Sequence, residues 1–88
     1  MGNAVKLGDN DTGHGSHPPT SIAAGSPTVN VDGLPIARQG DPLAPHGHSR
    51  SIISGSSSVF IDGKPAARTG DAVSCGGVLI GGGSVNIG

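Results

Sequence analysis

The chain has 88 residues, enough for one domain, and lies at the low end of the lengths that can bury a self-sufficient hydrophobic core. It contains 17 glycines and 7 prolines, and its formal net charge is −1. This low charge and short, phased clusters of apolar residues indicate a folded glycine-rich protein rather than a disordered one. Five basic residues and one aromatic residue argue against a nucleic-acid partner, which needs a basic surface or stacking platforms.

Glycine and proline interrupt the sequence too often for helices. The longest stretches free of both have seven residues, whereas an average helix has about 11–12. The composition therefore predicts an all-β fold. Met1–Lys6 lacks the apolar core of a signal peptide, and no segment is long enough to span a bilayer, so we expect synthesis as a cytosolic protein. The single Cys75 cannot form an internal disulfide, so stability has to come from a metal, oligomerisation or a partner.

Gly-Asp pairs mark three repeats, at approximately residues 8–39, 40–69 and 70–88. The third repeat stops where its turn would begin, and residues 4–7 align with the segment that it lacks. We therefore predict a single domain over residues 1–88, closed by pairing of Val85–Ile87 with Ala4–Lys6. Such closure gives three equivalent hairpins about a pseudo-threefold axis. A linear solenoid is the alternative, and the split third repeat argues against it.

The hairpins are predicted from two segments that match without a gap, Val29–Arg38 and Val59–Arg68. Each has an alternating strand followed by Asp-Gly, the pair favoured in a two-residue type I′ turn. Pro35 or Pro65 near the start of the return strand removes a hydrogen-bond donor, which indicates an edge position. The sheets should therefore be narrow.

Metal-binding residue types occur in the three loops after the Gly-Asp pairs. In each loop a histidine or the cysteine follows the aspartate by four or five residues, and threefold closure would bring these positions to one end of the axis. A further histidine in the second loop completes a tetrahedral set suited to structural Zn²⁺, although ligand types alone leave iron open. The predicted ligands are His14, His46, His48 and Cys75, and the first loop also offers His17.

The other conspicuous residues are predicted to be structural. Asp9, Asp41 and Asp71 recur at turns, where an aspartate caps its own backbone, rather than as catalytic carboxylates. The equivalent Lys6, Arg38 and Arg68 indicate a repeated surface or inter-strand contact rather than an anion site. Neither a nucleophile elbow nor a phosphate-binding loop is present, so the protein is not expected to be an enzyme.

Pro65-Ala66-Ala67-Arg68, with the variant Pro35-Ile36-Ala37-Arg38, belongs to a pattern that spans nearly the whole chain: Gly-Ser-x-x-Val-x-Ile-Asp-Gly-x-Pro-Ala-Ala-Arg-x-Gly-Asp. This pattern resembles the PAAR-repeat proteins. The resemblance implies a small metal-stabilised cone of three β-hairpin faces, one copy of which caps a trimeric spike and sharpens it for membrane puncture. The spike would be of the VgrG type of type VI secretion or the central spike of a contractile phage tail.

The resemblance also implies a zinc ion held by three histidines and one cysteine, similar to His14, His46, His48 and Cys75. His17 stands before Pro18-Pro19 at a place that looks usually aromatic in relatives, so it is left out of the site. We expect the protein in the cytoplasm before assembly, then at the spike tip and in the target, or in the virion if phage-encoded. Because the repeats fill the chain, any effector cargo would be a separate protein. A metal sensor or storage module and a small hydrolase are the alternatives.

Overall fold

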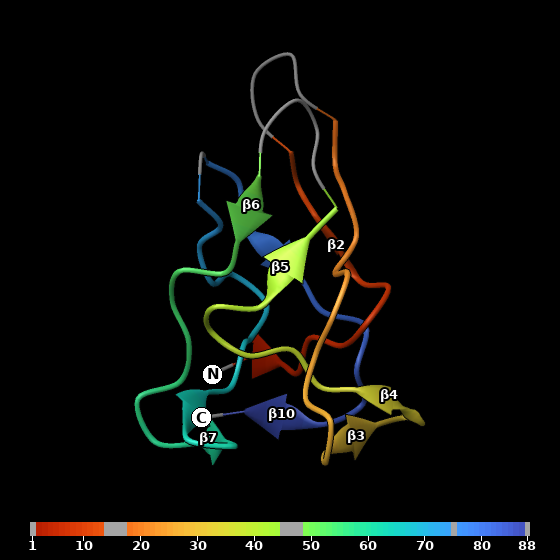
Figure 1. Ribbon diagram of the computed structural model, residues 1–88, viewed down its shortest axis with the longest axis vertical. Helices are drawn as coiled ribbons and strands as arrows, with labels where there is room; N and C mark the ends of the chain where they lie inside the picture. The colour runs from red at the N-terminus through yellow and green to blue at the C-terminus, as the bar shows by residue number, and fades with distance from the viewer. Residues whose placement is uncertain (1, 14–17, 45–48, 75, 88) are drawn as a thin grey trace.

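The computed structural model describes residues 2–13, 18–44, 49–74 and 76–87, over which all regular structure is β (Figure 1). These ranges contain no helix, hence none that could cross a membrane, and the all-β prediction is confirmed. Five two-stranded antiparallel sheets pair β1 with β10, β2 with β9, β3 with β4, β5 with β6 and β7 with β8. The strands are β1 (Gly2–Asn3), β2 (Asn10–Asp11), β3 (Asn30–Val31), β4 (Leu34–Pro35), β5 (Pro42–Leu43), β6 (Arg50–Ser51), β7 (Phe60–Ile61), β8 (Lys64–Pro65), β9 (Leu79–Ile80) and β10 (Asn86–Ile87).

The two Asp-Gly hairpins form as predicted. In the turn between β3 and β4, φ is 52° at Asp32 and 82° at Gly33, and in the turn between β7 and β8 it is 54° at Asp62 and 80° at Gly63. Positive φ at both central residues defines the type I′ turn, whose twist matches that of the flanking strands. Both return strands contain proline and both sheets have only two strands, as expected from the missing donor.

The terminal segments pair with one another, which confirms the predicted closure, but in a different register. β1 pairs with β10 through Gly2 opposite Ile87 and Asn3 opposite Asn86. The prediction that Ala4–Lys6 forms this strand was therefore wrong by about two residues. The observed register matches that of β3 and β4, and beyond Ala4 the chain leaves its partner strand to join a central ring.

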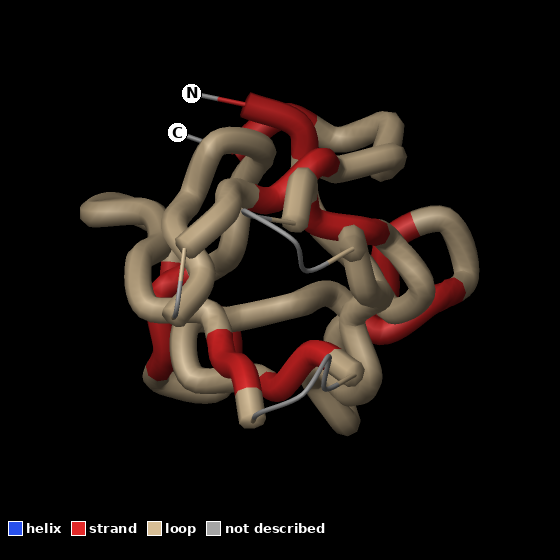
Figure 2. The backbone as a smooth tube through the Cα atoms, turned by 90° about the horizontal axis from the view of Figure 1, so that it is seen from above, coloured by secondary structure: helices blue, strands red, loops and turns tan. Residues whose placement is uncertain are grey.

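The ring consists of three backbone hydrogen bonds that close on themselves. The amide of Val5 donates to the carbonyl of Ala67 (3.3 Å), that of Ala67 to Ala37 (3.0 Å) and that of Ala37 to Val5 (2.7 Å). All three residues are fully buried. The pseudo-threefold relation of the units is thus present in the backbone itself, and Figure 2 shows the chain surrounding this axis.

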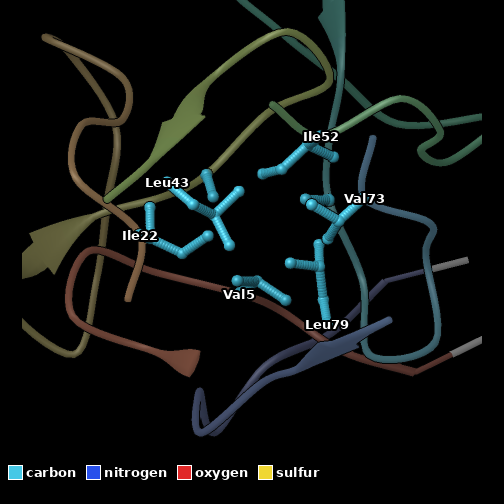
Figure 3. Close-up of a cluster of buried hydrophobic side chains, with 8 residues drawn as sticks. Val5, Ile22, Leu43, Ile52, Val73 and Leu79 are labelled. Carbon is cyan, nitrogen blue, oxygen red and sulfur yellow. The ribbon is translucent and has the colours of Figure 1, made fainter. Parts of the chain in front are cut away.

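The molecule, whose extents are 32 × 22 × 21 Å, has two apolar clusters, and the larger one includes the three ring residues. In the larger cluster, side chains from all three units point toward one another (Figure 3). The smaller cluster lies among the hairpins β3–β4 and β7–β8 and the paired terminal strands β1 and β10, and it contains Ala4, Val31, Ile36, Ala66 and Ile87. The larger cluster contains Val5, Ile22, Ala37, Leu43, Ile52, Ala67, Val73 and Leu79.

Glycine occurs at one point of each unit because two backbones nearly touch there. A Cβ at Gly25 or Gly81 would lie 2.7 Å from a carbonyl oxygen, and one at Gly55 would lie 2.9 Å from one. In the first two units the next residue, Ser26 or Ser56, donates its amide to the return strand. In the third unit this bond is donated one residue later, by Gly83, although Gly81 and Val85 have the same spacing as Gly25 and Val29.

Candidate metal centre

All the predicted ligands, His14, His46, His48 and Cys75, lie outside the residues that the structure describes, as does His17. Within residues 2–13, 18–44, 49–74 and 76–87 there is no group of three or more His, Cys, Asp or Glu side chains that could hold a metal ion. The structure therefore bears on this site through the segments that flank the ligands.

Those flanking segments converge at the end of the molecule opposite the β3–β4 and β7–β8 hairpins (Figure 1). One equivalent backbone hydrogen bond joins the flanking segments of neighbouring units, so the threefold pattern of the ring continues toward the loops. The three bonds, all of 2.9 Å, run from the amides of Thr12, Ala44 and Ser74 to the carbonyls of Val78, Ser21 and Ser51 respectively. Two side-chain bonds reinforce them: Val78 N to Thr12 Oγ1 (3.1 Å) and Ser51 N to Ser74 Oγ (2.9 Å).

A buried ion pair lies among these flanking segments. The Arg50 side chain is fully buried and donates from Nη2 to the Asp11 carboxylate and to the Gly76 carbonyl (3.1 Å), and from Nη1 to Thr20 Oγ1 (2.8 Å). Asp11 also accepts a bond from the Thr20 amide (2.9 Å). Burial alone raises the pKa of Asp11, but the hydrogen bonds from Arg50 and from the Thr20 and Gly13 amides outweigh it, so the pKa is lowered.

The repeated basic residues pair with the aspartates of their own Gly-Asp turns. Lys6 with Asp9, Arg38 with Asp41 and Arg68 with Asp71 each form an ion pair of 2.9 Å, and each aspartate also accepts the backbone amide of its basic partner. The interpretation of the aspartates as turn residues is therefore right. Arg38 is buried, so its contact is not a surface one.

The aspartates of the type I′ turns bind the neighbouring unit. Asp62 accepts hydrogen bonds from the hydroxyls of Ser26 (2.5 Å) and Thr28 (2.6 Å) and from Arg38 (3.1 Å), and these bonds lower its pKa. Asp32 likewise accepts the amide and hydroxyl of Ser84. Each turn thus links two units at the end of the molecule that carries the β3–β4 and β7–β8 hairpins, called the hairpin end below.

These lowered pKa values predict how stability depends on pH. A carboxyl whose pKa is lower in the folded state contributes stability that is complete above its unfolded pKa, about 3.9, and is lost as the pH falls through the folded value. We expect the free energy of unfolding of chelator-treated protein to be nearly constant from about pH 7 to 5 and to fall below about pH 4. Urea titrations across this range test it. Asp62→Asn should show a smaller fall, and stability that is unchanged down to about pH 2 would contradict the prediction.

A family model described as the PAAR motif matches residues 12–81 of the chain. The chain belongs to the PAAR family. PAAR proteins are structural and non-enzymatic, which confirms the prediction that this chain is not an enzyme, and membership implies a spike-tip protein of contractile injection systems. A search of curated proteins found no match. The match spans all three loops of this PAAR protein that carry predicted metal ligands.

Reasoning from the sequence of this PAAR protein missed two sets of polar contacts. The first is the buried pair of Asp11 and Arg50, and the second is the binding of the turn aspartates to the neighbouring unit. A signal for the first was present. Asp11 follows its Gly-Asp pair at the position that Leu43 and Val73 occupy in the other units, so alignment alone puts a charge at a core position.

Proposed function

We propose that this protein caps the end of a trimeric spike of the VgrG type or of a phage tail, one copy per trimer, and sharpens it for membrane puncture. The observation that carries the proposal is the closed ring of Val5, Ala37 and Ala67, which gives a single chain three near-equivalent sides. A monomer of this kind can meet a true threefold trimer with three similar contacts. Assembly in the cytoplasm belongs to the same proposal.

The hairpin end is the surface that would contact the spike. It lies opposite the end where the segments flanking the three predicted ligand loops converge (Figure 1), and it exposes large apolar side chains on or next to three strands. Phe60 in β7 is 57% exposed, Leu34 in β4 39%, and Val85, which precedes β10, 47%. Covering them would bury apolar area, a favourable contribution of about 25 cal/mol per Å².

We further propose that the loops bind one structural zinc ion through His14, His46, His48 and Cys75. Imidazole nitrogen and thiolate sulfur are the ligands that zinc prefers, and the described segments that flank these residues are hydrogen-bonded to one another across the three units. The ion would supply a crosslink between the three loops. Four protein ligands leave no open position, as in a structural site.

The docking proposal is tested by native mass spectrometry of the untagged protein mixed with a VgrG-type trimer and with a phage spike trimer. We expect one chain bound per trimer of one of these classes. Phe60→Glu places a charge on the hairpin end and should abolish binding. Ile53→Glu, at a position of similar exposure (53%) beside the larger core cluster, is the matched control and should bind as wild type does. Failure of the wild type to bind either trimer would contradict the proposed function.

A further inference from the structure

The core is threefold except at one layer, next to the ligand-bearing loops. Three equivalent pairings of the units occur there: Ile22 with Leu43, Ile52 with Val73, and Leu79 with Asp11. Asp11 is therefore the structural equivalent of two core residues, yet it is charged and only 1% exposed.

The partner of Asp11 breaks the symmetry in the same layer. Arg50 precedes Ile52 by two residues, as Thr20 precedes Ile22 and Gly77 precedes Leu79. A Cβ at residue 77 would lie 2.8 Å from Asp11 Oδ2 and 3.4 Å from Arg50 Nη2. Glycine in the third unit thus leaves the space that the ion pair occupies, so three positions in three units are adapted to one another.

The guanidinium reaches a segment next to every loop. Asp11 and Thr20 flank the loop that carries His14, Gly76 follows Cys75, and Arg50 itself follows His48 by two residues. All three partners accept hydrogen bonds from the two terminal nitrogens, and Asp11 Oδ1 also holds the Thr20 amide. Among the described residues, Arg50 Nε has no hydrogen-bond partner.

Filling the core does not require this pair. Removing two charges from water is costly, and replacing a buried ion pair by apolar residues of similar volume is often neutral or stabilising. Leu43 and Val73 show that apolar residues fit at two equivalent positions. What the pair adds is a set of directed bonds between the flanks of the loops.

We propose that Arg50 is a positioning residue that holds the bases of the three loops together before a metal binds. The loop bases are the described segments that adjoin residues 14–17, 45–48 and 75. The role of Arg50 in metal binding rests on the proposed zinc site, whereas its role in holding the loop flanks together does not. The hydrogen bonds that carry it are all within the described part of the protein.

The test is hydrogen exchange, followed by NMR, in chelator-treated protein. Lysine at position 50 keeps the charge but not the planar fork that serves separate acceptors. Arg50→Lys should lower the protection of the Thr12, Thr20 and Ser74 amides about tenfold or more, corresponding to about 1.4 kcal/mol, while the ring amides of Val5 and Ala67 keep theirs. The proposal would be overturned if protection fell equally at the loop-base amides and the ring amides, or if it did not fall at the loop-base amides.

Two further variants separate this role from general stability. Arg38→Lys changes another buried arginine–aspartate pair and should leave the loop-base amides as in wild type. Thr20→Val keeps the shape and the ion pair but removes the Nη1 acceptor. It should reduce protection at Ser74 and Thr12 by a smaller factor, and protection equal to wild type would count against the proposal even if Arg50→Lys does not fold.

Zinc affinity, measured by competition with a chromophoric chelator, provides the second readout. Loss of an outer partner of a metal site typically weakens binding 10–100-fold, and we expect Arg50→Lys to fall in this range and Arg38→Lys to match wild type. Equal affinity of Arg50→Lys and wild type would overturn the role in metal binding. If wild type itself binds no zinc, the metal centre is refuted and the exchange data alone decide whether Arg50 organises the loops.

Discussion

Chelation is expected to lower the midpoint of thermal unfolding by about 15 °C or more. A ligand that binds only the folded state stabilises it by about 4 kcal/mol at about 1,000 times its Kd, and each kcal/mol moves the midpoint by about 4–8 °C in a domain of 60–100 residues. The effect should be large here because so short a chain has a small core. Calorimetry with and without a zinc chelator, with elemental analysis showing one zinc per chain, measures it.

The matched control for chelation is Cys75→Ser, which removes the proposed thiolate ligand at almost constant volume. The variant should unfold near the midpoint of chelated wild type, and chelator should change its midpoint little. Identical midpoints for wild type with and without chelator would contradict the proposal that zinc stabilises this fold.

Ile52→Ala is expected to destabilise the protein by about 2–5 kcal/mol, because it removes a fully buried side chain and leaves a cavity. Ile52 belongs to the larger core cluster, where it faces side chains from the other units (Figure 3).

Ile53→Ala is the matched control, because the neighbouring side chain is 53% exposed. This change should cost less than about 0.5 kcal/mol, as surface substitutions usually do. Urea denaturation of both variants in the presence of chelator compares them without a metal contribution. Equal losses of stability would mean that the larger cluster is not the stabilising core.

The sequence was sufficient where a local signal decides the structure. Asp-Gly after an alternating strand determines a type I′ turn within four residues, so both complete hairpins could be predicted. Frequent glycine and proline excluded helices in the same local way. The pairing of the chain ends was predicted from the repeat pattern, because a unit that lacks its return strand needs one from elsewhere.

The register of the terminal strands could not be obtained in that way. Aligning the chain ends does not determine the register of their pairing. The observed register follows from the point at which the chain leaves β10, at Ala4, to join the ring. Sheet β2–β9 was also missed, because it joins two units and has no turn to mark it. The Asp11–Arg50 pair depends on side chains 39 positions apart, a relation that no local pattern carries.

The central ring has a consequence for how the protein folds. The three ring residues, Val5, Ala37 and Ala67, lie in the first, middle and last thirds of the sequence. The first strand, β1, pairs with the last strand, β10. Most contacts between residues are therefore non-local, which raises the contact order and slows folding relative to a helical protein of the same size. On the ribosome, β1 has to wait for β10 to emerge, so the fold is completed only after synthesis of this segment. A circular permutant that joins β10 directly to β1 by a short turn would replace this longest-range contact by a hairpin, and it should fold faster with little change in the native contacts.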